Sequence, residues 1–97
     1  MSNINAFELI RCQQEKDAKK IEAYKKIYYS IEKKISISSS MNLYYTWFEV
    51  PEFILGFPLY NLSDCIDYIV QNLISNGFKA EHYNPNILLI KWIPDSM

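Results

Sequence analysis

The segment from Leu62 to Phe78 places the strongest constraint on the fold of this 97-residue chain, because it specifies a helix and marks both of its ends. Asn61 or Ser63 offers a side-chain oxygen to cap the first turn. Asn76-Gly77 supplies a residue that can take positive φ and end the helix, and Phe78 then folds back over that end. Between these signals, apolar residues recur at the steps of three and four that define an amphipathic helix: Leu62, Ile66, Ile69, Val70, Leu73 and Ile74.

The segment before this helix predicts a strand and then a turn. Residues 44–50 are aromatic and β-branched, which is typical of strands, and Pro51 ends them. Residues 51–55 predict a single helical turn, with Pro51 at its first position and Gly56 closing it.

The segment after the helix predicts a β-hairpin. Residues 79–83 form a short, half-polar strand, and Asn84-Pro85-Asn86 forms a turn. Residues 87–93 carry apolar side chains on both faces, and such strands are usually central and covered on both sides. We therefore expect residues 87–93 to lie between residues 44–50 and 79–83 in a small three-stranded sheet.

The first third of the chain predicts one long amphipathic helix, from about Asn5 to Ile35. The serine-rich residues 36–42 have neither helical nor strand periodicity and predict a polar linker. The fold class is therefore α+β, with a helical arm and linker over residues 1–43 and a compact α/β module over residues 44–97. The helix has the spacing of a heptad seam at Phe7, Ile10, Gln14, Asp17, Ile21, Tyr24, Tyr28, Ile31 and Ile35.

The seam of this helix must be covered, because isolated helices of this length are marginal in water. Gln14 and Asp17 interrupt the seam near its start. We therefore expect the second half, from Ile21 to Ile35, to be packed and the first half to project. The seam is compatible both with packing on the chain's own module and with a coiled coil to another subunit.

Charge is distributed unevenly along the chain, although the net charge is only −1. Residues 1–35 carry eight Lys and Arg against five Asp and Glu, a balance of +3, whereas residues 36–97 carry two against six, a balance of −4. Lys19, Lys26 and Lys33 recur every seven residues on the helix face opposite the seam. These lysines are candidates for contact with an anionic partner, or they form a solvated face.

The residues provide no constellation suited to catalysis or to a cofactor. His82 is the single histidine, and a Cys65–His82 pair is less plausible than a structural role, because a cysteine at helical spacing is usually a core residue. Cys12, Cys65 and His82 lack the spacing of a zinc site, which normally uses four ligands. The two glycines form no phosphate-binding loop. We therefore expect no enzyme activity, no metal and no cofactor.

Aromatic residues are concentrated in residues 44–60, beyond what one small core readily covers. We expect some of them to form a surface for a protein partner, since aromatic anchors dominate interface energetics. The alternative function is nucleic-acid binding, because strand, helix and hairpin follow one another as in a winged helix. Asp64 and Asp67 on the predicted helix oppose that reading. The candidate partner-binding residues are Tyr44, Tyr45, Trp47, Phe53, Phe57 and Tyr60.

A series of residues in the C-terminal half resembles a pattern in short uncharacterised proteins of nucleocytoplasmic large DNA viruses. The resemblance covers roughly residues 44–92 and implies no enzyme activity and no functional residue. The series consists of Val50-Pro51, Phe53, Gly56, Pro58, Tyr60, Cys65, Tyr68, Leu73, Asn76-Gly77-Phe78, Tyr83, Pro85-Asn86, Leu88, Ile90 and Trp92.

The expected function is that of a small viral protein-interaction module, a component or adaptor of the virion or of an intracellular replication site. A protein partner or a homo-oligomer is expected. Two cysteines suit a reducing compartment better than a disulfide framework. Because residues 1–12 do not resemble a signal peptide and no apolar stretch is long enough to span a membrane, we expect an intracellular protein that is not secreted.

Overall fold

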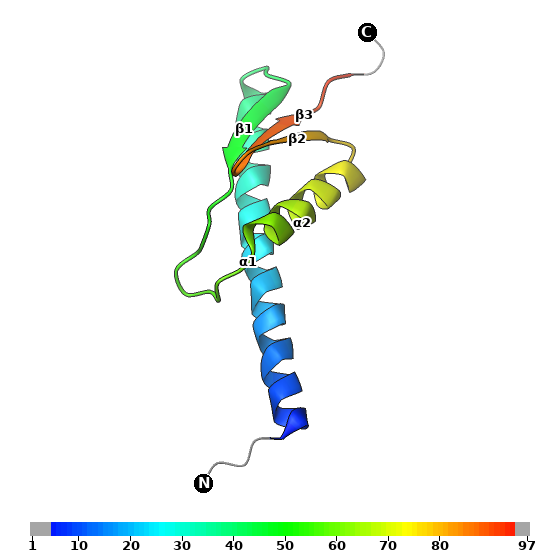
Figure 1. The fold of residues 1–97 in the computed structure, drawn as a ribbon. Coiled ribbons are helices and arrows are strands. Elements are labelled where there is room, and N and C mark those ends of the chain that lie inside the picture. The colour runs from blue at the N-terminus through cyan, green and yellow to red at the C-terminus, as the bar shows by residue number, and fades with distance from the viewer. Residues whose placement is uncertain (1–4, 95–97) are drawn as a thin grey trace.

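The structure is a computed structural model that describes residues 5–94. This part of the chain contains two helices and three strands, and the predicted α+β class is confirmed (Figure 1). The elements in order are α1 (Ala6–Ser40), β1 (Tyr45–Glu49), α2 (Leu62–Ser75), β2 (Lys79–Tyr83) and β3 (Ile87–Lys91).

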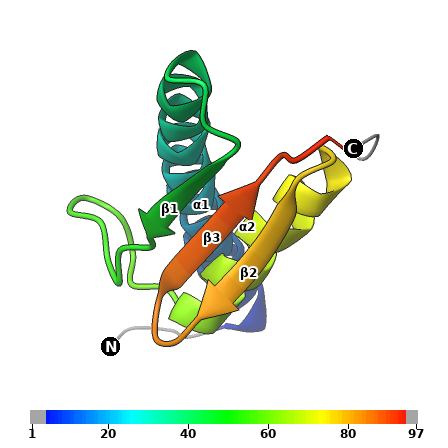
Figure 2. The same ribbon diagram turned by 90° about the horizontal axis from the view of Figure 1, so that it is seen from above.

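The three strands form one antiparallel sheet in the order β1-β3-β2, so β3 is central as predicted. Both helices lie behind the same face of this sheet in the view of Figure 2. Leu88 and Ile90 point into that covered face and are fully buried. The expectation that β3 is covered on both sides is wrong, because no helix or strand within residues 5–94 lies on the other face.

Helix α2 begins and ends at the residues that the sequence marks. The Asn61 side chain accepts a hydrogen bond from the Asp64 backbone N–H at 3.2 Å, so Asn61 is the cap. At the other end, Gly77 has φ of 89°. The Phe78 N–H donates to the Leu73 carbonyl at 3.0 Å, which closes the helix as a Schellman motif.

Helix α1 is longer than predicted, because the serine-rich segment is helical through Ser40 rather than a linker. Ser38 is buried and Ile35 packs against the core, so tertiary contacts outweigh the weak helix propensity of serine. The helix ends at Ser40, Asn42 just beyond it has φ of 64°, and the Leu43 N–H donates to the Ser38 carbonyl at 3.0 Å. The division of the chain between residues 43 and 44 stays a prediction.

The connection between β1 and α2 differs from the predicted helical turn. The Phe57 N–H donates to the Ile54 carbonyl at 3.2 Å, and Gly56 has φ of 88°, so the segment makes a tight turn around glycine. The Tyr60 hydroxyl donates to the Pro51 carbonyl and ties the two ends of this connection together.

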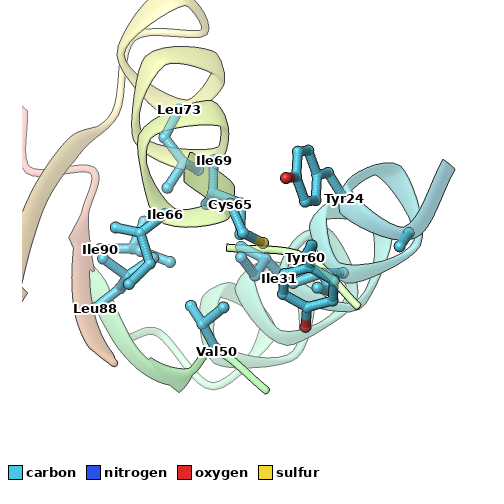
Figure 3. Close-up of a cluster of buried hydrophobic side chains, with 12 residues drawn as sticks. Tyr24, Ile31, Val50, Tyr60, Cys65, Ile66, Ile69, Leu73, Leu88 and Ile90 are labelled. Atoms are coloured by element: carbon cyan, nitrogen blue, oxygen red, sulfur yellow. The ribbon is translucent and has the colours of Figure 1, made fainter. Parts of the chain in front are cut away.

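The core lies between the covered face of the sheet and the two helices (Figure 3). Tyr24 of α1 contacts Tyr60 edge-on with ring centroids 5.5 Å apart, and Tyr68 of α2 at 5.4 Å. Ile31 is fully buried, which contributes about 1.5–3 kcal/mol before side-chain entropy is subtracted. The other fully or nearly fully buried apolar residues are Ala23, Ile27, Val50, Cys65, Ile66, Ile69, Leu73, Leu88 and Ile90.

The two halves of α1 have different surroundings, as expected. Every residue from 5 to 19 is exposed, and this half extends away from the rest of the molecule in Figure 1. The buried face of the second half consists of Ala23, Tyr24, Ile27, Ile31 and Ser38. Ile21 is 44% exposed and does not belong to it. The heptad seam misplaces Ile21 because a straight α-helix rotates about 20° per heptad relative to a 3.5-residue repeat.

Candidate functional site

The candidate site is the face of the sheet that the helices leave uncovered, which we call the open face. Directly opposed residues in antiparallel strands point to the same side. The register therefore aligns three rows of side chains across β1, β3 and β2 on this face. The rows are Tyr45–Lys91–Lys79, Trp47–Leu89–Glu81 and Glu49–Ile87–Tyr83.

Two aromatic rings meet across the central strand on the open face. The ring centroids of Trp47 and Tyr83 lie 5.7 Å apart, although the residues belong to the two outer strands. Leu89, between them on β3, is only 9% exposed, while Trp47 and Tyr83 are 46% and 49% exposed. The rings therefore shield Leu89 and themselves remain half-open to solvent.

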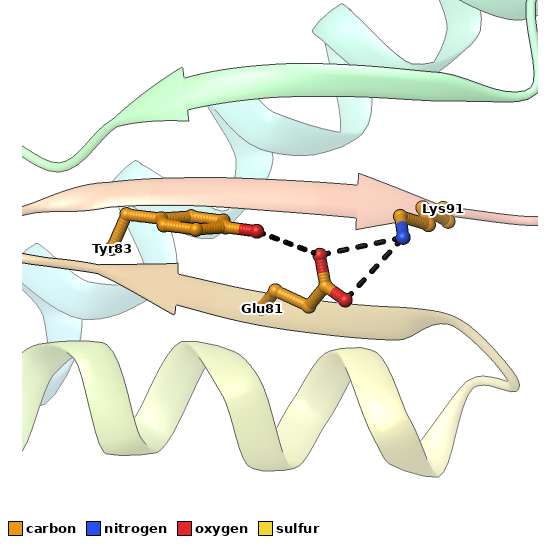
Figure 4. Close-up of polar contacts among 3 residues, drawn as sticks. All are labelled: Glu81, Tyr83 and Lys91. Carbon is orange, nitrogen blue, oxygen red and sulfur yellow. Dashed lines mark hydrogen bonds and ion pairs between the residues drawn. The ribbon is translucent and has the colours of Figure 1, made fainter.

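A polar network holds one side of this aromatic pair (Figure 4). The Lys91 ammonium lies 3.3 Å from Glu81 Oε2, and the Tyr83 hydroxyl donates to the same oxygen at 3.2 Å. Both charged side chains are partly exposed, so the ion pair contributes little to stability, on the order of 0.2–1 kcal/mol. The effect of the network is positional. The hydrogen bond to Glu81 orients Tyr83 toward Trp47, and the ion pair holds Lys91 at the edge of the aromatic surface.

A groove of about 380 Å³ opens beside this pair, at the end of the sheet where β1 begins and β3 ends. A rigid antiparallel sheet forms its floor, and its walls are aromatic or aliphatic with one cation. Such a groove suits an apolar or aromatic side chain with a hydrogen-bond acceptor or a carboxylate close by. Its lining consists of Tyr44, Tyr45, Trp47, Leu89, Lys91 and Ile93.

Three of the six predicted partner-binding residues meet in this groove, namely Tyr44, Tyr45 and Trp47. Phe53 is 58% exposed but lies in the connection between β1 and α2. Phe57 is half-buried. Tyr60 is buried, with its hydroxyl bonded to Pro51, so its predicted place on an exposed surface is wrong.

Sequence reasoning missed Tyr83, Leu89, Lys91 and Ile93. The signal for two of them was present, because Ile87, Leu89 and Ile93 make the second face of residues 87–93 apolar. That pattern predicts a strand covered on both sides. Tyr83 joins the site only through the cross-strand register, which the sequence does not show.

Comparison with known proteins identifies the family. Residues 4–74 match a family of unknown function, DUF5759. The chain belongs to this family. The DUF5759 chain is also 30% identical over 77 residues to the uncharacterised protein R447 of Acanthamoeba polyphaga mimivirus. That similarity covers 75% of the chain but only 63% of the relative, so the chain spans less than two thirds of the relative's length. No solved structure matches the chain.

These findings confirm the coarser part of the predicted resemblance, a relationship to a viral protein of unknown function. The finer C-terminal pattern over residues 44–92 stays a prediction, because the family match ends at residue 74. Among residues 5–94 of the DUF5759 chain, neither helix is long and apolar enough to cross a membrane.

The structure does not bring Cys65 and His82 together. Cys65 is fully buried in the core, and burial raises the pKa of its thiol to about 12, so desolvation outweighs the helix dipole there. His82 is exposed, and its Nε2 lies 3.1 Å from the Pro85 carbonyl. Within residues 5–94, no group of three His, Cys, Asp or Glu side chains is placed to hold a metal ion.

The predicted lysine row of the DUF5759 chain is exposed at Lys19, Lys26 and Lys33. The Lys26 ammonium lies 5.5 Å from the centre of the Phe57 ring, and that of Lys33 lies 4.7 Å from the Tyr29 ring. Helix α2 exposes Asp64 and Asp67 and has no lysine or arginine in its sequence. The lysines therefore lie on α1, apart from the helix that a winged-helix protein would insert into DNA.

Proposed function

We propose that this DUF5759 chain is a non-catalytic protein-interaction module, which binds a protein partner through the open face of its sheet. It acts as a component or adaptor of a larger assembly, in a virion or at an intracellular replication site. The observation that supports this function is the groove between Tyr45, Trp47, Leu89 and Ile93, on the sheet face that α1 and α2 leave uncovered.

The physical argument is that the open face already has the character of an interface core. Trp47, Tyr45 and Tyr83 are each close to half-exposed, so a partner would remove a large aromatic area from water. Strand pairing fixes their backbone positions, and the hydrogen bond from the Tyr83 hydroxyl to Glu81 orients one of the three rings, which lowers the cost of ordering this face on binding. Lys91 adds a cation at the rim, where it favours a partner with an acidic or carbonyl group.

Nucleic-acid binding is the second candidate, and the exposed Lys19, Lys26 and Lys33 are the observation that favours it. A labelled duplex titrated at two salt concentrations tests it, because phosphate contacts make affinity fall steeply with salt. Salt-sensitive binding that is weakened by Lys26→Glu and unaffected by Trp47→Ala would favour nucleic acid over the open face.

The proposed function is tested by site-specific photo-crosslinking in the cells that naturally produce the chain. A benzophenone amino acid replaces Tyr45 on the open face, and Gln71 on the exposed side of α2 serves as the matched control. We expect a discrete protein adduct from position 45, lost when Trp47→Ala is added, and no such adduct from position 71. Equal crosslinking from both positions, or none from position 45, would contradict the proposal.

A further inference from the structure

The projecting half of α1 carries apolar side chains that its own chain leaves exposed. Phe7 is 86% exposed, Ile10 is 53% exposed and Ile21 is 44% exposed. Helix formation is only marginally favourable without packing, and a helix of about four turns gains little from propensity alone. These three residues follow the seam spacing, whereas the exposed Leu9 lies off it, so a second helix along the seam would cover the three.

The order of residues along the seam distinguishes between the possible partners and directions. In a parallel pair of two identical copies, each seam residue faces itself, so Asp17 would face Asp17 and two carboxylates would repel one another. In an antiparallel pair, the seam positions 7, 14 and 21 of one copy face the seam positions 10, 17 and 24 of the other. In one antiparallel register, Phe7, Ile10 and Gln14 of one copy face Tyr24, Ile21 and Asp17 of the second copy, respectively. The reciprocal pairs form by symmetry.

This register is self-complementary in polarity. Its outer layers join apolar residues, of which Tyr24 is only 8% exposed and offers little surface, and its central layers join an amide donor to a carboxylate. Asp17 already accepts a hydrogen bond from the Gln13 side chain at 3.0 Å, so its carboxylate is accessible to amide donors. Shifting the antiparallel register by one heptad would instead place Phe7 against Asp17 and Ile10 against Gln14. That alternative buries a charge beside an aromatic ring.

The flanking positions and the surface at the end of the helix pair fit the same register. Arg11 would lie beside Ala18 of the second copy, and Gln13 beside Lys20, so no like charges meet. Phe7 of the second copy would reach the point where α1 enters the body. A hollow of about 300 Å³ lies there, where Ile21 and Tyr24 supply the apolar part of the lining and Asp17, Lys20, Asn61 and Asp64 the polar part.

We propose that the projecting half of α1 is a self-association site, which binds the same half of a second copy of this chain in an antiparallel helix pair. Ile10 packs against Ile21 of the second copy, and Phe7 occupies the hollow beside Tyr24. The pairing leaves the open face of the sheet free. It is therefore independent of the proposed binding of a protein partner there.

Cysteine crosslinking of the full chain tests both the contact and its direction. The exposed Cys12 is first replaced by serine, and the buried Cys65 is left in place. The double variant Ile10→Cys, Ile21→Cys should form a disulfide-linked dimer under mild oxidation, with position 10 joined to position 21 in peptide maps. The single variant Ile10→Cys is the control, because in the antiparallel register residue 10 of one copy lies far from residue 10 of the other. A linkage between positions 10 in the single variant, or no 10–21 linkage in the double variant, overturns the proposal.

Light scattering of the unmodified chain gives a second readout. A contact of this size is in the weak class of interfaces, so concentrations from about 1 to about 500 µM are needed. We expect the average mass to rise toward twice that of the monomer, and Ile10→Asp to abolish the rise. The matched control Ile37→Asp changes an equally exposed α1 residue outside the pair and should leave the rise intact. A monomer throughout, or equal effects of the two substitutions, overturns the proposal.

Discussion

The two halves of α1 belong to one continuous helix, yet only the second half is part of the folded body. Stepping by four residues along one row shows why. The row begins with Arg11, Glu15 and Lys19, and it continues with Ala23, Ile27 and Ile31. The charged part of the row is exposed, and the apolar part is buried against the sheet and α2. The composition of a single row therefore determines where the body begins along the helix.

This difference separates helix formation from helix packing. The second half is helical because burial of its apolar row supplies free energy that local propensity lacks. The first half extends a helix that is already nucleated, and its Asn5 cap accepts a hydrogen bond from the Glu8 N–H at 2.9 Å. Substitutions in the two halves should therefore differ sharply in their effect on the free energy of unfolding.

The largest effect is expected from Ile31→Asp in the packed half. Ile31 is fully buried among apolar side chains, so an aspartate there has no partner and should cost at least about 3 kcal/mol of unfolding free energy. The matched control is Leu9→Asp in the projecting half, where Leu9 is 58% exposed and the cost should be small. Thermal unfolding of both variants measures the difference. Equal melting temperatures would show that the seam is not buried in the folded chain.

Ile31→Ala serves as a second variant if Ile31→Asp does not fold. Removing the side-chain methyl and methylene groups leaves a cavity and should cost about 2–5 kcal/mol. A cost well below this range would mean that the second half of α1 packs more loosely than its burial indicates.

A smaller loss is expected at alkaline pH, and it arises where the packed half meets α2. Burial raises the pKa of the Cys65 thiol from 9.0 to about 12 and the pKa of Tyr60 from 10.0 to about 12. Below about pH 8, both groups are protonated in the folded and unfolded chains, so they contribute no pH dependence. Above it, the unfolded chain releases these protons first, so stability falls as pH rises toward 12.

Urea unfolding at several pH values between about 8 and 11 measures this decline. Burial also raises the pKa of Tyr24, so the slope should be reduced but not abolished in Cys65→Ala, where one of the three groups is absent. Changes in the projecting half, such as Leu9→Asp, should leave the slope unaltered. A slope that does not respond to Cys65→Ala would mean that the thiol is not the group responsible.

A loss of about 1 kcal/mol is expected from Asn42→Ala at the end of the packed half. Asn42 has φ of 64°, a conformation that asparagine tolerates and that strains alanine. Asn42→Gly is the control and should cost little, because glycine adopts this conformation freely. Denaturation midpoints of the two variants should differ in this order. A reversed order would contradict the argument from backbone strain, and an equal loss in both variants would indicate that the asparagine side chain is the important feature.

The sequence was sufficient for those parts of the fold that local signals specify. Asn61, Gly77 and the apolar steps between them define α2 without tertiary information, and the turn at Pro85 separates two strands. The helical serine segment could not be predicted, because it depends on tertiary contacts: α1 packs against β1, and Ser38 is buried. The weak helix propensity of serine favours a non-helical linker there.

The candidate site was predictable only in part, for a related reason. Tyr44, Tyr45 and Trp47 stand together in the sequence and were expected on a surface. Tyr83 reaches Trp47 across two strand pairings, so its place depends on a register that no single segment contains. Tyr60 shows the reverse case, because a hydrogen bond to Pro51 and the Tyr24 ring place it in the core.

The smallest effect is expected from Lys26→Glu, which lies within the packed half but on its outer side. Lys26 is exposed and has no carboxylate within salt-bridge distance among the described residues. Its contact with the Phe57 ring, at 5.5 Å from the centroid, contributes on the order of 0.5 kcal/mol at an exposed site. We therefore expect a melting temperature within about 2–3 °C of the unmodified chain. The same substitution reverses one charge of the lysine row, so binding of an anionic partner should weaken while the fold is retained. A large loss of stability from Lys26→Glu would mean that the packed half of α1 depends on more than the burial of Ala23, Ile27 and Ile31.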